Sequence, residues 1–572
     1  MNKKPTVIDF FCGAGGFSEG FRQQGFDIIA GYDKWKPAID TFNFNFAEGK
    51  GRSLDLFKIG RSLKTLEALP DSQVILGSPP CVSFSTSNHS GKADKSMGKR
   101  LTTIFLKIVA IKKHKKGSIL EAWFMENVVQ SIDHVSKNYT FAQLGLKRWA
   151  EKNGYDPKRV AISLKDNHAV VNAADHGCPQ QRIRAVAGEI ISKGRLIIPK
   201  THYTDVDGLQ RYLTLEQIRR ALPAPNREKS EQSIYDPLYE HLTIKLVELT
   251  DHFYDTGLYR TEWMNSRFLK TNHPFMGKMS FPEKEDKPSR TITATKIGTS
   301  REAIIYRSEY GRAGHGEFRI PTVRESATLM GFPIHHQFIG GEYAKYTLVG
   351  NAVSPVVSRA FAAMVRTAMG LSRVRRPIIR AKVDISTVPN LNSFKPKEFN
   401  SPPKKKQGAT FRRHPFKDGN ITVTLSNYDI IKDQDTREKT TDKWITSVQY
   451  GIGEGFPCQR YKDHYYREIE GLVKSIEHGE RFVETINNGF SETIARGELL
   501  QALHEAQQGR DGYVTPAELL ERVAELVDGI PFTEKDIQLK DKRVFRKAIV
   551  PKKQVFALYA INKICSVANE RP

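Results

Sequence analysis

Short apolar segments alternate with a helical pattern near the start of the chain. The apolar segments span 5–11, 27–32, 74–78 and 121–127, and helical periodicity covers 101–113. Strands that alternate with helices in this way form a parallel sheet with helices on both faces. The sequence therefore predicts an α/β fold with a doubly wound, mostly parallel sheet. Ligands of such sheets bind beyond the carboxyl ends of the strands, so the residues that follow the strands are the candidate site.

The charge of the chain indicates a class of partner. Lys and Arg number 88 and Asp and Glu number 64, which leaves a formal net charge of +24. Such a surplus attracts polyanions because each neutralised phosphate releases counterions, so nucleic acid is the leading partner class. A surplus that merely keeps the protein soluble is the alternative.

Two further features of the sequence indicate where the protein works and whether it holds disulfides or metals. No stretch approaches the roughly 18 uninterrupted apolar residues of a membrane span. We therefore expect a cytoplasmic, nucleoid-associated protein that does not bind membranes. The five cysteines lack C-x-x-C spacing, so the sequence predicts neither a disulfide framework nor a metal site.

A glycine-rich turn follows the first predicted strand. In DFFCGAGGFSEGF, residues 9–21, Gly13 and Gly16 let the backbone turn tightly and approach a ligand closely. Asp33, at the end of the second predicted strand, is placed to accept hydrogen bonds from ribose hydroxyls. Ser18 stands where a dinucleotide fingerprint has glycine or alanine. The pattern indicates a nucleoside-containing cofactor, and a plain strand-to-helix turn is the alternative.

Cys81 directly follows another predicted strand. Pro79 and Pro80 precede it, and each proline fixes φ and removes a backbone donor, so the thiol is expected at the mouth of the crevice. A nucleophile requires this kind of rigid mounting. The Ser-, Gly- and Lys-rich residues 82–100 predict a loop that closes over a polyanionic substrate. Taken alone, Cys81 is more often a buried structural cysteine than a nucleophile.

A carboxylate and two guanidinium groups are predicted near the same edge. Glu126 comes at the carboxyl end of the predicted strand 121–127, where an inward carboxylate is costly unless it has a partner or a task. In HGCPQQRIRAV, residues 176–186, the side chains of Gln180, Arg182 and Arg184 alternate into a strand and are expected to share one face. The three groups are therefore predicted to converge with the thiol.

Together these motifs resemble the DNA (cytosine-5-)methyltransferases of the bacterial modification type. The resemblance rests on blocks that occur in the order of the family: DFFCGAGGFSEGF, GYDKW, SLDLF, GSPPCVSFSTS, ENV, GCPQQRIR, KPSRTITAT and YTLVGNAVSP. It implies a class I S-adenosylmethionine-dependent methyltransferase fold with an inserted target-recognition domain. It also implies that the helix after GNAVSP packs back near the cofactor site, and five residues have the helical spacing for this: Val357, Ala360, Phe361, Met364 and Val365.

The resemblance implies catalytic roles for four residues. Cys81 would add as a thiolate to C6 of cytosine, Glu126 would hold the N3 and amine edge of the base, and Arg182 and Arg184 would orient the base. Substrate-binding roles are implied for three polar residues: Ser85, Ser87 and Gln180. The target cytosine must leave the duplex stack to be reached. Ser78 is a departure, since the family often has glycine there.

The resemblance also implies the cofactor, S-adenosylmethionine. Asp33 would bind the ribose and Asp55 the adenine amine. The full set of implied cofactor contacts is Phe11, Gly13, Gly16, Asp33, Asp55, Pro80, Asn351 and Val353. A second cysteine, Cys458 in GFPCQRY, matches the nucleophile motif locally. It lacks a preceding parallel strand and the blocks that follow Cys81, so Cys81 is the predicted nucleophile.

The chain divides into five predicted segments. Residues 1–191 and 287–370 are the two parts of the catalytic domain, and 192–286 are the target-recognition region, rich in Arg, Lys, Asn, His and aromatic residues. Residues 371–417 hold 13 Lys and Arg residues against two acids and predict a basic linker that grips DNA or is merely solvated. Residues 418–572 are expected to form a separate, largely helical domain, and their function is not indicated.

Three functions remain open on the sequence alone. The predicted function is a sequence-specific DNA cytosine-5 methyltransferase that acts on double-stranded DNA in restriction-modification or phage defence, with a restriction endonuclease or defence components as further partners. A tRNA cytosine-5 methyltransferase on the same fold is one alternative. A DNA-binding protein that has lost catalysis is the other.

Overall fold

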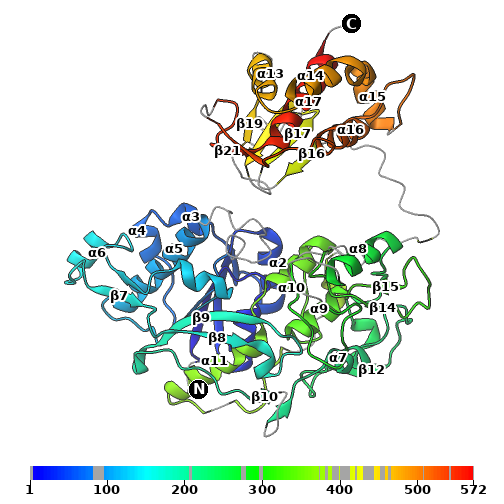
Figure 1. Ribbon diagram of the computed structural model, residues 1–572. Helices are drawn as coiled ribbons and strands as arrows, with labels where there is room; N and C mark the ends of the chain where they lie inside the picture. Colours follow the sequence, from blue (N-terminus) through cyan, green and yellow to red (C-terminus); the bar gives the residue numbers. More distant parts are fainter. Residues whose placement is uncertain are drawn as a thin grey trace. The chain divides into compact units, whose positions relative to one another are not determined.

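Two compact units make up the described part of the chain, separated after residue 400 (Figure 1). The computed structural model describes residues 4–80, 96–204, 209–271, 279–294, 300–372, 374–380, 384–389, 394, 399, 413–418, 421–428, 443–450, 458–461, 465–506, 508–539 and 543–570. Cys81, Ser85 and Ser87 therefore lie outside the described residues. Each unit has a hydrophobic core of its own.

A seven-stranded sheet organises the first unit, with the strand order β3-β2-β1-β4-β5-β9-β8. Its strands are β1 (Thr6–Phe10), β2 (Asp27–Asp33), β3 (Gly51–Ser53), β4 (Val74–Gly77), β5 (Ala122–Asn127), β8 (His168–Asn172) and β9 (Ile183–Ile190). The first five run parallel to one another, and β9 is antiparallel to both of its neighbours. The predicted mostly parallel sheet is confirmed.

Helices cover both faces of this sheet because alternate strand residues point to opposite sides. On one face, Val7 of β1 packs with Phe17 of α1 (Gly16–Gln23) and Phe361 of α11 (Pro355–Ala368). On the other face, Ile8 packs with Phe105 of α5 (Ser96–His114). The smaller elements of this part are α2 (Lys36–Phe46), α3 (Leu56–Ile59), α4 (Leu63–Glu67), β6 (Asn138–Thr140), α6 (Lys147–Lys152) and β7 (Val160–Ser163).

The predicted target-recognition region and the closing catalytic segment share one core. Leu215 and Ile218 of α7 (Leu215–Ala221) are buried with Leu329 of α9 (Val323–Met330) and Val349 of α10 (Glu342–Asn351). The other elements are β10 (Tyr203–Thr204), β11 (Gln210–Arg211), β12 (Ser233–Tyr235), β13 (Thr243–Lys245), α8 (Arg260–Thr271), β14 (Tyr306–Arg307) and β15 (Phe318–Arg319). Packing therefore continues across the predicted boundary at residues 286 and 287.

Between residues 374 and 399, the described part of the predicted basic linker packs against the first unit, whereas its last residues, 413–417, lie in a strand of the second unit, Arg413–Asp418. The Ile378 N–H donates to Gln23 O at 2.9 Å, and the rings of Phe394 and Tyr254 stack with centroids 3.8 Å apart. Val388 is buried. These residues belong to the first unit and do not form a free tether.

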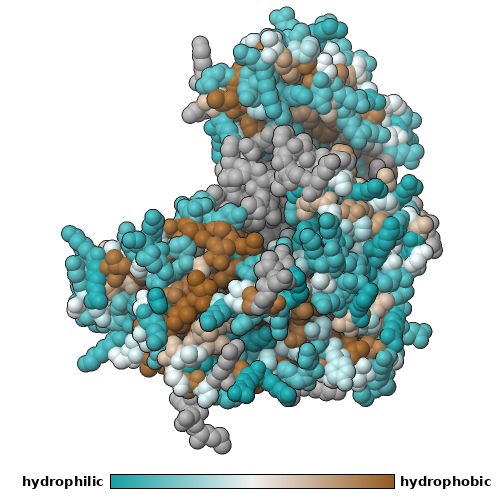
Figure 2. Space-filling view, turned by 60° about the horizontal axis from the view of Figure 1, so that its bottom comes forward, coloured by the Kyte–Doolittle hydropathy of each residue, from teal (hydrophilic) through white to brown (hydrophobic). Residues whose placement is uncertain are grey.

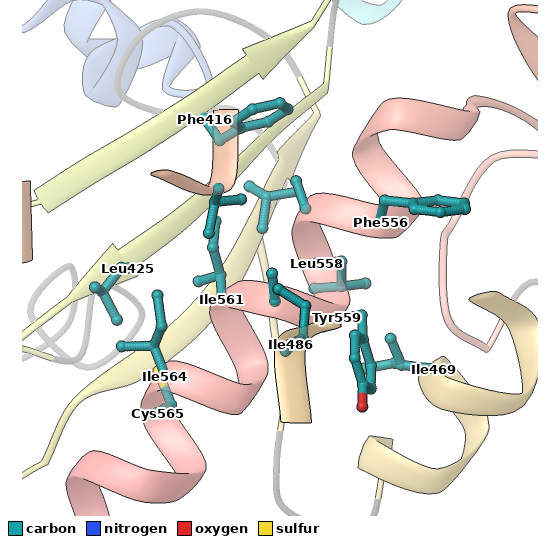
Figure 3. Packing of buried hydrophobic residues seen from close by; sticks show 14 of the residues in the cluster. Phe416, Leu425, Ile469, Ile486, Phe556, Leu558, Tyr559, Ile561, Ile564 and Cys565 are labelled. Carbon is teal, nitrogen blue, oxygen red and sulfur yellow. The ribbon is translucent and has the colours of Figure 1, made fainter. Parts of the chain in front are cut away.

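The second unit joins helices to a sheet that the sequence did not predict. Four antiparallel strands lie in the order β16 (Arg413–Asp418), β17 (Ile421–Ser426), β18 (Ile445–Tyr450) and β19 (Cys458–Arg460). Figure 3 shows Ile561 and Ile564 of α17 (Lys552–Asn569) next to Leu425 of β17. The remaining elements are α13 (Tyr466–Lys474), α14 (Gly479–Thr485), α15 (Glu498–Ala506), α16 (Pro516–Asp528), β20 (Asp536–Gln538) and β21 (Ile549–Pro551).

Helix α16 begins with a capping box. Thr515 caps the helix, and its side chain and that of Glu518 form the reciprocal hydrogen bonds of a capping box. Leu519 and Val523 are fully buried on the inner face. The predominance of helices in this unit also agrees with the sequence.

The surface of the first unit includes one area where hydrophobic residues gather, drawn in brown in Figure 2. Val170 of the edge strand β8 and Ile183 of β9 are about half exposed. Within the described residues, no single helix is long and apolar enough to cross a membrane. One bent pair, α10 with α11, passes that test by length and composition alone. Val349 in α10 and Phe361 in α11 are buried in the cores described above.

Candidate active site

The turn between β1 and α1 is fastened to the end of β2. Gly13 and Gly15 adopt φ values of 51° and 79°, a left-handed conformation that glycine tolerates best. The Gly13 N–H donates to Asp33 Oδ2 at 3.1 Å, and the Trp35 N–H donates to Asp33 Oδ1 at 3.0 Å. A Cβ at Gly13 would meet no atom within 4 Å, so the turn faces open space.

Two carboxyl groups lie beyond neighbouring strand ends. Asp33 ends β2, and burial raises the pKa of its carboxyl group while the backbone N–H groups of Trp35 and Gly13 lower it. Asp55 follows β3, and its Oδ1 accepts from the Phe57 N–H at 3.0 Å as the cap of α3. Both side chains therefore have fixed orientations at the edge where α/β sheets bind ligands.

Asp9 is a buried acid beneath the glycine turn. Its Oδ2 accepts from Ser18 Oγ at 2.7 Å, and its Oδ1 has no hydrogen-bond partner among the described residues. Burial raises the pKa of this carboxyl group to about 7, although the Ser18 hydrogen bonds lower it. Ser18, which departs from a dinucleotide fingerprint, thus connects the first turn of α1 to β1.

The closing segment approaches the turn at Gly16. A Cβ at Gly16 would lie 2.1 Å from the Val353 carbonyl oxygen, so only glycine allows this contact. Gly20, one turn further along α1, would place a Cβ 2.3 Å from the Arg359 nitrogen of α11. Phe11 is half-buried beside the turn, and Asn351 is exposed at the end of α10. The predicted return of the helix after GNAVSP, α11, to the turn between β1 and α1 is confirmed.

The segment that leads to Cys81 is tied to the strands on both sides of β4. The Ser78 N–H donates to Phe10 O of β1 at 3.2 Å. Asn127 Nδ2, at the end of β5, donates to Pro79 O at 3.0 Å. Pro79 is buried and Pro80 is exposed. The backbone is therefore held up to Pro79, two residues before the predicted nucleophile.

Glu126 and Arg184 meet at this edge of the sheet. Glu126 is 6% exposed, and its Oε1 lies 3.2 Å from Arg184 Nε. Ser78 Oγ donates to Glu126 Oε2 at 3.0 Å. The carboxyl group thus has one partner on each oxygen, beside the end of the strand that precedes Cys81. The predicted meeting of the carboxylate with a guanidinium group is observed for Arg184.

Gln180 and Arg182 lie elsewhere, and the prediction that they share the face of Arg184 is wrong. The Arg182 guanidinium donates to three backbone carbonyls of the closing segment, and its side chain is buried. Gln180 is fully buried, with Nε2 donating to Leu329 O and Oε1 accepting from the Ile292 N–H. Both residues precede β9, where strand alternation does not apply. Their contacts fasten two parts of the catalytic domain to each other.

The other cysteines are poor nucleophile candidates. Cys12, Cys178 and Cys565 are buried cysteines. Burial raises the pKa of the Cys12 thiol well above its usual range and that of Cys178 to about 11, so both stay protonated near neutral pH. Cys458 lies in β19, the edge strand of an antiparallel sheet in the second unit, and does not follow a parallel strand.

Sequence reasoning missed two residues of the site. Asn127 was part of the matching block ENV but had no assigned task, and its side chain holds the Pro79 carbonyl. Ser78 counted only as a departure from the family, and its hydroxyl contacts Glu126. For Asn127 the block itself was a signal. For Ser78 no signal in the sequence indicates which strand its side chain faces.

These features define a class of protein. The strand order, the glycine turn after β1, the acid that ends β2 and the antiparallel β9 together describe the α/β fold of S-adenosylmethionine-dependent methyltransferases. Within that class, the chain belongs to the C-5 cytosine-specific DNA methylase family, whose model matches residues 5–366. It is a DNA (cytosine-5-)methyltransferase, and the second unit lies outside the match.

Two type II methyltransferases support the family assignment, and each aligns with about the same share of the chain as the family model does. The chain is 28% identical over 363 residues to the type II methyltransferase M1.HphI of Haemophilus parahaemolyticus, an alignment that covers 62% of this chain and 85% of the relative. It is 28% identical over 351 residues to the type II methyltransferase M.HgiDI of Herpetosiphon aurantiacus, covering 61% and 89%. Among solved structures, the methyltransferase EhMeth of Entamoeba histolytica aligns with a TM-score of 0.38 and 16% identity, over 64% of this chain and 99% of the other.

Proposed function

We propose that this enzyme methylates C5 of a cytosine flipped out of a specific duplex DNA sequence, through a covalent bond between Cys81 Sγ and C6. The observation that carries the proposal is the 3.2 Å contact between Glu126 and Arg184, beside the braced end of β4 that leads to Cys81. A carboxylate and a guanidinium group at this place suit the polar edge of a pyrimidine.

The proposed chemistry balances as an addition followed by an elimination. The Cys81 thiolate adds to C6, and the electron pair of the C5–C6 double bond makes C5 nucleophilic. After C5 has gained the methyl group, a base removes the C5 proton, the double bond re-forms and the thiolate leaves. Glu126 binds the N3 and amine edge, which makes C6 more electrophilic, and Arg184 orients the base.

S-adenosylmethionine fits the turn between β1 and α1. The open space above Gly13 leaves room for a ligand, and Asp33 has its two oxygens fixed by backbone donors, with lone pairs left for ribose hydroxyls. Asp55 would bind the adenine amine, and Phe11, Gly16, Pro80, Asn351 and Val353 would complete the site. When bound, the cofactor would supply an electrophilic methyl group, whose bond to the sulfonium sulfur breaks so that the neutral thioether is the leaving group.

We infer that residues 192–286 recognise the target sequence, with the outer face of α8 as one contact. Phe268 is 59% and Met264 49% exposed, and Arg267 lies on the same face. No ion pair engages the Arg267 guanidinium among the residues that the structure describes. On the inner face, Lys270 Nζ donates to Ala303 O at 2.6 Å. Helix α8 is thus anchored on its inner side. Its outer side presents a basic group that suits DNA phosphates and apolar groups that suit thymine methyl groups.

The basic surplus supports DNA contact by the first unit. Residues 401–572 contain 28 Lys and Arg residues against 25 Asp and Glu residues, so this part of the chain carries only 3 of the 24 surplus positive charges. Phosphate contacts are therefore expected from residues 1–400. The type II relatives support a place in a restriction-modification system, with a cognate endonuclease or other defence components as further partners.

Transfer of labelled methyl groups from S-adenosylmethionine tests the proposal. Unmethylated duplex DNA and tRNA serve as parallel substrates, and 5-methylcytosine is mapped afterwards. We expect label in one short duplex motif, lost in Cys81→Ser and retained in the matched control Cys458→Ser. Label in tRNA alone would favour the tRNA methyltransferase. Binding of DNA without transfer to either polymer would favour a protein that has lost catalysis.

A further inference from the structure

We propose that Ser78 is a positioning residue that aims the Glu126 carboxyl group at the target cytosine. This inference rests on the proposed function, since it assumes that Glu126 binds the base. Ser78 Oγ donates to Glu126 Oε2 at 3.0 Å, while Arg184 Nε lies 3.2 Å from Oε1. The two partners approach different oxygens and so restrict rotation of the carboxyl group about its last bond.

The contact links two strands at the reacting edge. Ser78 follows β4 and Glu126 lies in β5, which pairs with β4 in parallel register. The backbone of Ser78 is held in turn, because its N–H donates to Phe10 O and the next carbonyl, that of Pro79, accepts from Asn127. The hydroxyl is therefore presented from a fixed backbone, so little further conformational entropy is lost when it holds Glu126.

The remaining capacity of the carboxyl group matches the edge of cytosine. A carboxylate offers about four lone-pair sites, two on each oxygen. Ser78 and Arg184 engage one site on each, which leaves one site per oxygen for the base. The cytosine edge presents the exocyclic amine, a donor, beside N3, an acceptor, so one oxygen accepts from the amine and the other reaches N3 through a proton that the carboxyl group donates. A carboxyl group that was free to rotate would meet these two atoms in several orientations, of which few are productive.

The role of Ser78 can be tested by removing its hydroxyl group. Where the family often has glycine, no hydroxyl is present. Ser72, at the other end of β4, provides a matched control because its hydroxyl donates to Val74 O at 2.7 Å, far along the strand from Glu126. Removing either hydroxyl costs one hydrogen bond next to an end of β4.

The first test compares Ser78→Ala, Ser78→Thr and Ser72→Ala. Affinity is measured for two duplexes, one with cytosine at the target position and one with an abasic site there. We expect Ser78→Ala to bind the cytosine duplex about tenfold more weakly and the abasic duplex as wild type does, with a similar loss in the rate of methyl transfer. Ser78→Thr should restore both, and Ser72→Ala should change neither. Equal losses on both duplexes, or no loss, would overturn the proposal.

The second test is a double-mutant cycle with Glu126→Gln. If Ser78 acts through Glu126, the effect of Ser78→Ala on the affinity for the cytosine duplex should shrink in the Glu126→Gln background. An undiminished effect would show that Ser78 acts independently and would overturn the inference while leaving the proposed function in place. If Glu126→Gln alone transfers methyl groups at the wild-type rate, the proposed role of Glu126 fails, and that of Ser78 fails with it.

Discussion

Replacing Arg182 distinguishes a structural role from a catalytic one. Its guanidinium donates to the carbonyl oxygens of Ile292 at 3.2 Å, Gly350 at 3.1 Å and Ala352 at 2.9 Å, and the side chain is only 4% exposed. In Arg182→Ala these buried acceptors lose a partner, at about 1–3 kcal/mol each. We therefore expect the free energy of unfolding of the first unit to fall by about 3 kcal/mol or more.

Urea denaturation followed by tryptophan fluorescence measures this effect. Four of the five tryptophans lie in the first unit, and Trp444 alone reports the second. Arg184→Ala is the matched control, since Arg184 pairs with Glu126 at the candidate site and its loss should abolish methyl transfer with a smaller change in stability. If Arg182→Ala unfolded at the wild-type urea concentration but transferred no methyl groups, Arg182 would act on the substrate and the structural assignment would be wrong.

Four further changes test the remaining features. Glu126→Gln should lower the rate of methyl transfer by at least tenfold without lowering affinity for S-adenosylmethionine, as rate and cofactor-binding measurements can show. Gly20→Ala would force a Cβ to 2.3 Å from the Arg359 nitrogen, and we expect a loss of about 1–3 kcal/mol in the urea assay. Asp9 has a pKa of about 7 in the folded protein against 3.8 as its ordinary value, so the native state binds more protons and stability should fall as pH rises between these values, by at most about 1.4 kcal/mol per pH unit. Asp9→Asn should remove this slope, and an unchanged pH profile of urea midpoints would contradict it. Phe268→Ala should weaken binding of the target duplex more than binding of unrelated DNA, and equal weakening would place α8 outside sequence recognition.

Local patterns in the sequence were enough to predict the elements that carry the candidate site. The apolar runs around β1, β4 and β5 are strands whose side chains are buried on both faces, and such runs need no distant information to be recognised. The spacing of Phe361 and Val365 likewise indicated the inner face of α11. The residues after these strands follow from the topology, since carboxyl ends of parallel strands share one edge.

The same local reasoning failed where a distant segment supplies the partner. Arg182 and Arg184 are two residues apart and chemically identical, yet one binds carbonyls of the closing segment and the other binds Glu126. The partner at Gly350 lies 168 residues away along the chain. Alternation indicates which side chains share a face only within a strand, and Arg182 precedes β9.

The second unit shows the same difference between contacts that neighbouring residues encode and contacts that depend on distant segments. The capping box at Thr515 is formed by residues three apart, so neighbouring residues alone encode it. The strands β16, β17, β18 and β19 satisfy their backbone groups by pairing with one another, and their short segments carry too weak a pattern to reveal that pairing.

The sequence by itself determined the class of fold, the family and the order of the reacting groups, because strands, turns and caps are encoded by neighbouring residues. The tertiary structure decided which polar groups work together: Ser78 with Glu126, Asn127 with Pro79, and Arg182 with the closing segment. Buried polar groups must find partners, and those partners come from whichever segment packing brings near. Contacts of that kind depend on the whole folded chain and leave no local pattern to be read.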